Sequence, residues 1–196
     1  LRANAAKALT EFAEKLGIPV ANTFMAKGVI PFGHPMSLGS VGLQSNDYVN
    51  TGFANADVII CIGYDMVEYH PYLWHPSRDR TLIHIDTTHA EVDGYYSVVL
   101  GVVGNITHSL NRIAALTSPH EGKAMRTLRD SLITEMNQHR RDTEFPVKPQ
   151  KIIWDLRTAM HLEDIVICDV VLIKCGCHGC SAVNTRTPVL FPMALP

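Results

Sequence analysis

The sequence lacks both a long apolar run and an excess of charge of one sign. Its longest purely apolar segments, such as Val58–Ile62, are far shorter than the roughly 20 residues that cross a bilayer. The 17 basic and 19 acidic residues nearly cancel, so no strong attraction to nucleic acid or to an anionic membrane is expected. The sequence therefore predicts neither nucleic acid nor membrane as a partner.

Evenly spread cysteines are also absent. There are five cysteines, and three of them lie in Cys175–Cys180, which is not the disulfide framework of a small secreted protein. This usage predicts a reducing, cytoplasmic location. The first residue is Leu1 rather than methionine, and no basic segment with an apolar signal core follows. We therefore expect the sequence to begin inside a longer protein.

What is present predicts an α/β fold. Residues 5–16 have apolar side chains at helical spacing and are followed by Gly17, a typical helix end. Residues 18–21 predict a short strand, and a loop rich in glycine and proline is expected over residues 27–42. The unbroken apolar run Val58–Ile62 predicts a strand buried on both faces. A second strand is expected at Thr81–Asp86, and Val98–Val103 is a third apolar, strand-like stretch. A doubly wound, Rossmann-like parallel sheet is the usual home of such strands.

The remainder predicts a linker and the start of a second α/β domain. Asn105 can cap a helix that runs to about residue 116, and residues 118–141 are highly charged, which favours an exposed connecting helix. Pro149 opens another helix, and Ile165–Asp169 has the pattern of a buried strand. We divide the chain into residues 1–116, a central nucleotide-fold domain without its first strand; 117–148, a charged helical linker; 149–170, the start of a second domain; and 171–196, an aberrant tail.

Ligands of open α/β sheets bind beyond the carboxyl ends of the strands. Asp86 could accept a ribose hydroxyl there, and four glycines could let the backbone approach a phosphate: Gly39, Gly42, Gly63 and Gly104. The alternative is a purely structural role, in which the glycines only turn the chain and Asp86 only caps a helix. The sequence contains no G-x-G-x-x-G segment, so the structural role is favoured on spacing alone.

Three other groups of residues could carry chemistry. The ten histidines are scattered and match no ligand spacing, so surface or core roles are expected. The aromatic residues around His70 could form a platform, but packing of a loop onto the domain is the more usual role. Cys175–Cys180 contains three thiols and an imidazole, which is chemically adequate for zinc.

Several segments resemble the central domain of acetolactate synthases, which depend on thiamine diphosphate. These segments are Leu16–Val20, Thr23–Pro31, Ala56–Asp65, Glu68–Pro71 and Ile83–Asp86 with Ala90-Glu91. The resemblance continues at Lys148-Pro149 and Asp164–Val170, like the entry to the cofactor-binding domain of the family. It implies a carboligase of the transferase class that joins two pyruvates to 2-acetolactate with loss of carbon dioxide, a step of branched-chain amino acid biosynthesis.

The resemblance also implies what this chain lacks. The family uses thiamine diphosphate anchored by Mg²⁺, and its activating glutamate and its metal-binding motif belong to regions not represented here. No catalytic or metal residue is therefore assigned, and the chain alone is expected to be inactive. Its expected partners are the N- and C-terminal domains of the same enzyme, in a full-length parent that forms a homo-oligomer.

The central domain binds FAD in biosynthetic members of the family. The matching positions are Thr23, Met25, Gly39, Gly42, Gly63, Asp86, Glu91 and Gly104. The segment Tyr64–Tyr69 stands where FAD-binding members have a run of basic and acidic residues, and Asn105 replaces the usual acid. These departures resemble the FAD-independent catabolic synthases, so FAD is doubtful and a scaffold without its ligand is the alternative.

The resemblance stops after Val170. If Val171–Cys180 is written back into codons and one G is restored, the new frame encodes Gly-Ala-His-Lys-Met-Trp, which is what the family has there. The same frame restores a family-like segment from Arg186 to Leu195. The hypothesis is that residues 171–196 are a frameshift product. Two other functions stay open, a stand-alone FAD- or NAD-binding module and a zinc-binding regulatory protein.

Overall fold

The fold is taken from a computed structural model, which describes residues 4–41, 48–119, 123–161 and 164. Helix α1 (Ala6–Leu16) is the predicted amphipathic helix, and Gly17 ends it in the left-handed region at φ 69°. Strand β1 (Val20–Asn22) follows and pairs in parallel with β2 (Ser37–Ser40). Strand β2 lies inside the segment predicted to be a loop. The prediction of a loop was therefore wrong for these residues. Ser37–Ser40 is fully buried, but it has no apolar run that would have indicated a strand.

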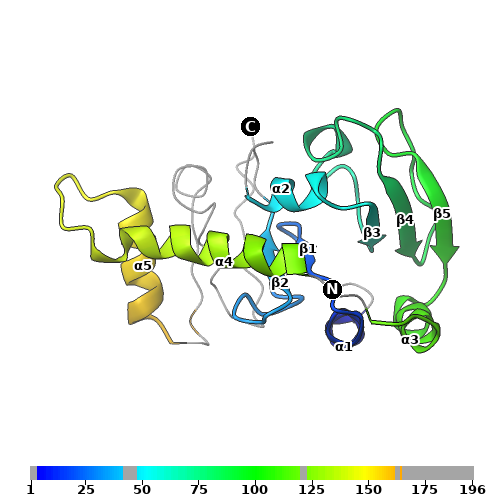
Figure 1. Cartoon of the computed structure of the whole chain (residues 1–196), viewed down its shortest axis with the longest axis horizontal. Helices are drawn as coiled ribbons and strands as arrows, with labels where there is room; N and C mark the ends of the chain where they lie inside the picture. The colour runs from blue at the N-terminus through cyan, green and yellow to red at the C-terminus, as the bar shows by residue number, and fades with distance from the viewer. Residues whose placement is uncertain (1–3, 42–47, 120–122, 162–163, 165–196) are drawn as a thin grey trace.

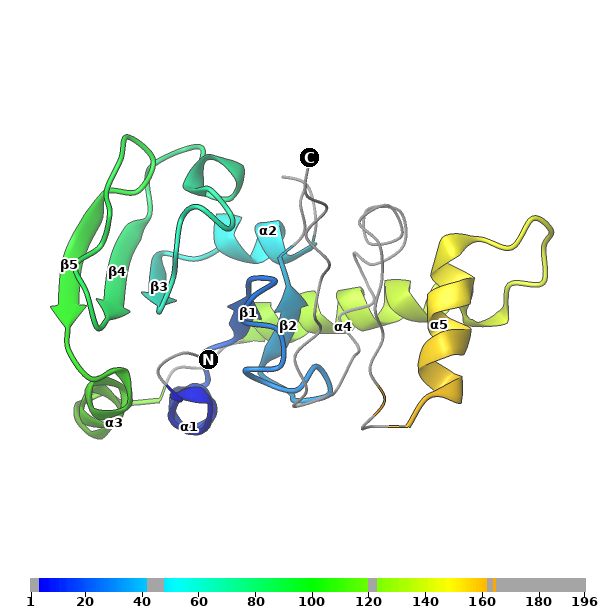
Figure 2. The same ribbon diagram turned by 180° about the vertical axis from the view of Figure 1, so that it is seen from behind.

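The larger sheet confirms the three predicted strands. Strands β3 (Val58–Ile62), β4 (Thr81–Asp86) and β5 (Val98–Val103) are all parallel, in the order β3-β4-β5. Helix α2 (Tyr48–Ala54) precedes β3, and a 3₁₀ turn, η1 (Pro71–Leu73), lies between β3 and β4. Along the molecule β1 lies between β2 and β3 (Figures 1 and 2). Parallel strands of this kind confirm the predicted α/β class.

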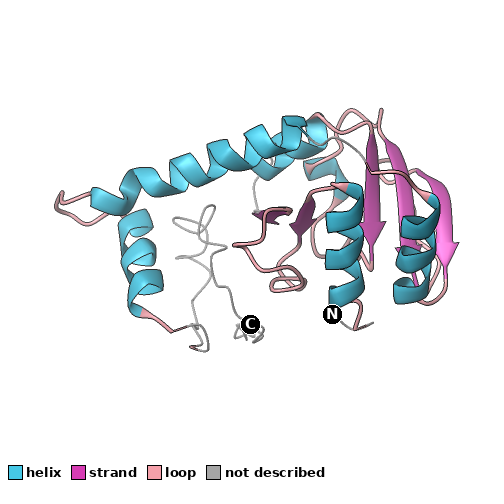
Figure 3. Cartoon of the chain, turned by 60° about the horizontal axis from the view of Figure 1, so that its bottom comes forward, coloured by secondary structure: helices cyan, strands magenta, loops and turns pink. Residues whose placement is uncertain are grey.

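Each face of the β3-β4-β5 sheet carries a core. Helices α1 and α3 (Ile106–Leu116) pack side by side on one face (Figure 3), where Phe12, Ile85 and Leu110 form the centre of an apolar core. Asn105 caps α3 as predicted, because its side chain accepts the amide of His108 at 2.9 Å. On the opposite face the core is aromatic and includes Trp74 and Tyr96.

Strand β5 is the outer strand of this sheet and is poorly covered. Val99 is 72% exposed, Leu100 53% and Val103 45%, although the sequence of the strand is that of a buried one. The apolar composition of β5 is therefore not explained by contacts within the part of the chain that the structure describes.

The charged segment forms helix α4 (Lys123–Gln138), followed by a 3₁₀ turn, η2 (His139–Arg141), and by α5 (Pro149–Ala159), which begins at the predicted Pro149. Helix α4 runs away from the sheets and brings α5 to the far end of the molecule (Figure 1). It is more than an exposed connector, since Leu132 is buried and the guanidinium of Arg129 donates to the carbonyls of Ser37 and Phe32. The expected strand at 165–169 and the tail lie outside the described residues.

Replacing Arg129 with alanine should lower the free energy of unfolding by about 1.5–3 kcal/mol. Hydrogen bonds made by a charged donor contribute about that much when partly buried, and Arg129 makes two of them to β2 and its preceding loop. Arg126, one turn earlier on α4 and exposed, provides the control, whose alanine variant should change stability by no more than about 0.5 kcal/mol. Equal urea midpoints for the two variants would contradict the anchoring role.

Within the described residues, no helix is both long enough and apolar enough to cross a membrane.

Candidate functional site

The candidate site lies at the carboxyl ends of the parallel strands. The amide of Gly63, just after β3, donates to the carbonyl of Ile85 at 3.0 Å, and the amide of Gly104, just after β5, donates to the carbonyl of Asp86 at 2.8 Å. Three predicted residues, Gly63, Asp86 and Gly104, therefore form one row across the edge of the sheet. This is where an open α/β sheet binds its ligands.

Gly63 occupies this row in a conformation that other residues rarely adopt. Its φ is +57°, and a Cβ built on it would meet only Ile106 Cδ1 at an ordinary 3.7 Å. The cost of a side chain there is thus conformational and not steric.

The Gly63→Ala variant should be less stable by about 1–2 kcal/mol, which is the cost of holding a residue with a Cβ in the left-handed region. Gly101→Ala in β5 is the matched control, because a Cβ there meets nothing within 4 Å and the residue has no positive φ. We expect that control to be neutral or slightly stabilising. Thermal unfolding of both variants measures the difference, and a neutral Gly63→Ala would show that the turn relaxes.

Thr23 and Met25 follow β1 and are held by a residue that the sequence reasoning did not select, Glu68. Its Oε2 accepts the hydroxyl of Thr23 at 2.8 Å, and its Oε1 accepts the backbone amide of Met25. Glu68 lies in the segment between β3 and η1, so the contact joins positions 45 and 43 residues apart. No local pattern could have identified it, although Glu68 is part of a segment that resembles the family.

The other predicted positions are less closely grouped. Gly39 is buried within β2 at φ 88° and is paired with Ala21. Glu91 is exposed in the loop after β4, and Gly42 lies outside the described residues. The Asp86 carboxylate accepts the amide of Thr87 at 2.6 Å, so it caps its own turn and not a neighbouring helix.

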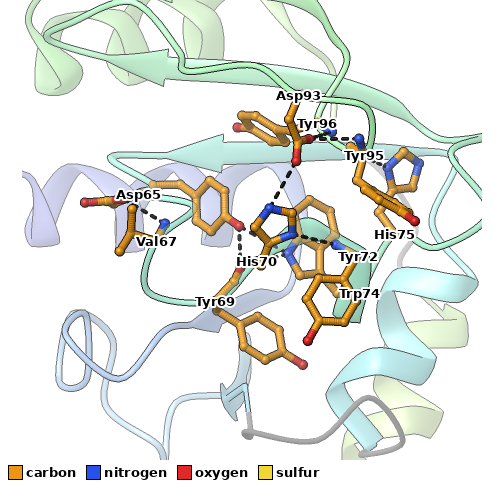
Figure 4. Close-up of polar contacts among 11 residues, drawn as sticks. Asp65, Val67, Tyr69, His70, Tyr72, Trp74, His75, Asp93, Tyr95 and Tyr96 are labelled. Atoms are coloured by element: carbon orange, nitrogen blue, oxygen red, sulfur yellow. Dashed lines mark hydrogen bonds and ion pairs between the residues drawn. The ribbon is translucent and has the colours of Figure 1, made fainter.

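A second polar network fixes the two loops beyond β3 and β4. Asp93 accepts the amides of Tyr95 and Tyr96 at 2.8 and 2.7 Å and pairs with His70 Nε2 at 3.0 Å (Figure 4). These amides and His70 hold the pKa of Asp93 below its usual range. The other ring nitrogen of His70 accepts the amide of Tyr72 at 3.3 Å. Both nitrogens of His70 are thus engaged, which leaves none to act as a general base.

The aromatic residues around His70 pack against one another and against the sheet. The Trp74 ring lies 5.3 Å from the ring of Phe53 and 5.9 Å from that of Tyr64, and its indole Nε1 donates to the carbonyl of Tyr69 at 3.3 Å. Trp74 and Tyr69 are buried, so their predicted packing role is confirmed. Only Tyr72 of this group is largely exposed, at 52%.

Burial keeps one thiol and two tyrosine hydroxyls of this core in their neutral forms. Burial raises the pKa of the Cys61 thiol to about 11 and raises the pKa of the Tyr64 and Tyr96 hydroxyls. A thiol with such a pKa is not a nucleophile near neutral pH. Cys61 is therefore a core residue.

His84 is buried in β4, with Nδ1 2.7 Å from the Tyr96 hydroxyl and Nε2 3.8 Å from Asp86. Burial lowers the pKa of His84, and the Asp86 charge opposes this only in part. The unfolded chain therefore binds a proton more readily than the folded chain does, so this contribution to stability is present above about pH 6.5 and is lost as the pH falls toward the lower folded pKa.

The His84→Gln variant should accordingly lose less stability than the original chain when melting is followed from about pH 7.5 down to about pH 5. The exposed His89 supplies the control, and His89→Gln should retain the original dependence. Identical slopes for the original chain and His84→Gln would place the titration elsewhere.

A metal site would need several ligand side chains close together. No group of three or more His, Cys, Asp or Glu side chains that could hold a metal ion is found among the described residues, and the cysteines of the zinc hypothesis lie outside them. The edge of the sheet offers glycines, which let a ligand approach the backbone, and one strand-terminal acid, Asp86, and this arrangement is that of the class of nucleotide-binding folds.

Comparison with known proteins identifies the family within that class. Residues 1–113 match the model of the thiamine pyrophosphate enzyme central domain, so this chain belongs to the thiamine pyrophosphate enzymes. It is 30% identical to an acetolactate synthase of Bacillus subtilis (strain 168) over 161 residues, which are 82% of this chain and 24% of that protein.

Two further relatives agree. The chain is 34% identical to a catabolic acetolactate synthase of Raoultella terrigena over 137 residues, 68% of this chain and 24% of that protein. It is 29% identical to a probable acetolactate synthase large subunit of Methanocaldococcus jannaschii over 163 residues, 80% of this chain and 27% of that protein. The chain thus spans about a quarter of the length of the curated relatives it matches, and the predicted family is confirmed.

Proposed function

We propose that this chain is the supporting central domain of an acetolactate synthase, and that the parent enzyme joins two pyruvates to 2-acetolactate with loss of carbon dioxide in the cytoplasm. The match of residues 1–113 to the central domain of thiamine pyrophosphate enzymes carries the proposal, and the similarity to acetolactate synthases narrows it. In this proposal the chain supplies the scaffold, and the N- and C-terminal domains of a homo-oligomeric parent supply the reacting groups.

No Mg²⁺ site is assigned to the described residues, and none of them is assigned to thiamine diphosphate. Mg²⁺ at a diphosphate is usually held by carboxylates and other oxygen ligands, and the described residues offer no such cluster. Both cofactors would therefore be held by other domains of the parent, and no step of the reaction is assigned to this chain.

The sheets also support a domain that needs one further strand. The amide of Thr81 donates to the carbonyl of Asp57, and the amide of Gly63 donates to the carbonyl of Ile85. The backbone groups of the odd-numbered residues along β3 therefore point toward β4. The backbone groups of Val58, Ile60 and Ile62 therefore point to the opposite edge, where no described strand pairs with β3.

One parallel strand between β1 and β3 would give the order β2-β1-x-β3-β4-β5, which is the 3-2-1-4-5-6 order of doubly wound nucleotide folds. We propose that this strand precedes α1 in the parent. Expression with the codons that precede Leu1 in the gene should raise the melting temperature, and an unchanged melting temperature would argue against it.

Enzyme assays test the proposed function directly. The full-length parent, with thiamine diphosphate and Mg²⁺, should convert pyruvate into acetolactate, whereas the purified chain should form none. Acetolactate formation by the chain alone would overturn the scaffold role, and an inactive, folded parent would overturn the proposed reaction.

We propose further that residues 171–196 arise from a lost base, so that the cysteine cluster has no selected role. Resequencing the DNA around codon 171 decides this, since an intact frame removes the hypothesis. Stoichiometric zinc in the purified chain would instead favour the zinc-binding alternative.

A further inference from the structure

Glu68 spans the place where this fold would bind a dinucleotide. From β1 the chain moves outward to β2, and from β3 it moves the other way to β4 and β5. The order of the strands thus reverses between β1 and β3, and the crevice beyond the strand ends at such a reversal is where doubly wound sheets bind their ligands. Glu68 follows β3, and its carboxylate contacts the residues that follow β1.

The Glu68 carboxylate also accepts hydrogen bonds from the two donors that a ligand would use there. The Thr23 hydroxyl, at 2.8 Å, and the Met25 amide donate to separate oxygens of Glu68. A hydroxyl and a backbone amide side by side form an anion-accepting pair, of the kind that binds a phosphate or a carbonyl oxygen. An incoming dinucleotide would have to displace Glu68, and its diphosphate would meet a negative charge of the same sign.

We propose that Glu68 is a specificity-determining residue that acts as an internal substitute for the nucleotide and keeps dinucleotides such as FAD out of the crevice. At the neighbouring strand ends no side chain crowds the backbone, since a Cβ added at Gly104 would meet nothing within 4 Å and one added at Gly63 would meet only Ile106 Cδ1 at 3.7 Å. Glu68 also ties the segment after β3 to the segment after β1, so the scaffold holds its shape without a ligand. This inference rests on the assigned nucleotide fold and deepens the scaffold role proposed above.

Titration with FAD, followed by flavin fluorescence, tests the proposal on the chain. The variants are Glu68→Ala, which removes the acceptor, and Glu68→Gln, which keeps its size but removes its charge. Asp65→Asn is the matched control, because Asp65 lies in the same segment and its carboxylate accepts the nearby amide of Val67, at 2.9 Å. All four proteins are checked for cooperative thermal unfolding before titration.

Glu68→Ala should bind FAD at least about tenfold more tightly than the original chain, with Glu68→Gln between them and Asp65→Asn unchanged. The proposal is overturned if the original chain binds FAD as tightly as Glu68→Ala, or if neither folded Glu68 variant binds at about 1 mM FAD. If Glu68→Ala does not unfold cooperatively, the isosteric Glu68→Gln decides alone. Failure here leaves the pyruvate assay of the parent untouched, so the two proposals are tested separately.

Discussion

Replacing Trp74 with alanine is expected to destabilise the protein by about 3–5 kcal/mol, the usual cost of deleting a buried tryptophan. The indole packs against Phe53, Tyr64 and Tyr96 and is only 7% exposed. Because small domains have a free energy of unfolding of about 5–15 kcal/mol in total, this loss would remove a large part of the stability of the protein.

Tyr72 provides the matched control for Trp74. It belongs to the same 3₁₀ turn region but is 52% exposed, so Tyr72→Ala should cost about 0.5 kcal/mol or less. Urea unfolding of both variants measures the difference. A large loss of stability in Tyr72→Ala together with a small loss in Trp74→Ala would contradict the packing role. It would favour the alternative, an aromatic platform.

The second large loss of stability is expected for a substitution on the other face of the sheet. Leu110 on α3 is fully buried, at 0% exposure, in contact with the core that α1 and the sheet form, and Leu110→Ala should cost about 3–5 kcal/mol through lost apolar burial and the cavity left behind. Leu116, on the last turn of the same helix, is 71% exposed and should tolerate alanine within about 0.5 kcal/mol.

Thermal melts of the two α3 variants give the comparison directly. Both changes are leucine to alanine in one helix, so helix propensity is the same and only burial differs. Equal melting temperatures would mean that α3 does not pack on the sheet as described.

The parts of the fold that local sequence specifies were predicted correctly. Helix α1 with Gly17, the cap Asn105 and the strand at Val58–Ile62 each carry their own periodic or capping signal. Strand β2 carries none, because Ser37–Ser40 is buried through its neighbours and not through apolar side chains of its own. Helix α2 was also not predicted from the sequence.

The same division holds for the candidate site. Gly63, Asp86 and Gly104 could be grouped in advance, since parallel strands end at one edge. Glu68 could not, because its partners lie more than forty residues away and belong to another loop. Asp93 had a partial signal, as an aspartate before Gly94 commonly accepts amides two and three residues on, but nothing local indicates its pairing with His70.

Strand β5 has a consequence for how this polypeptide behaves in solution. An outer strand with free backbone groups is a template for the addition of a strand from another molecule, and proteins usually protect such strands with lysine, proline or a bulge. The pairing of β5 with β4 is irregular between Val98 and Leu100, but Val98–Val103 contains neither charge nor proline, and this composition favours intermolecular β-pairing. A neighbouring segment or subunit that covers β5 would therefore do more than complete an enzyme, since it would keep this domain from aggregating at high concentration.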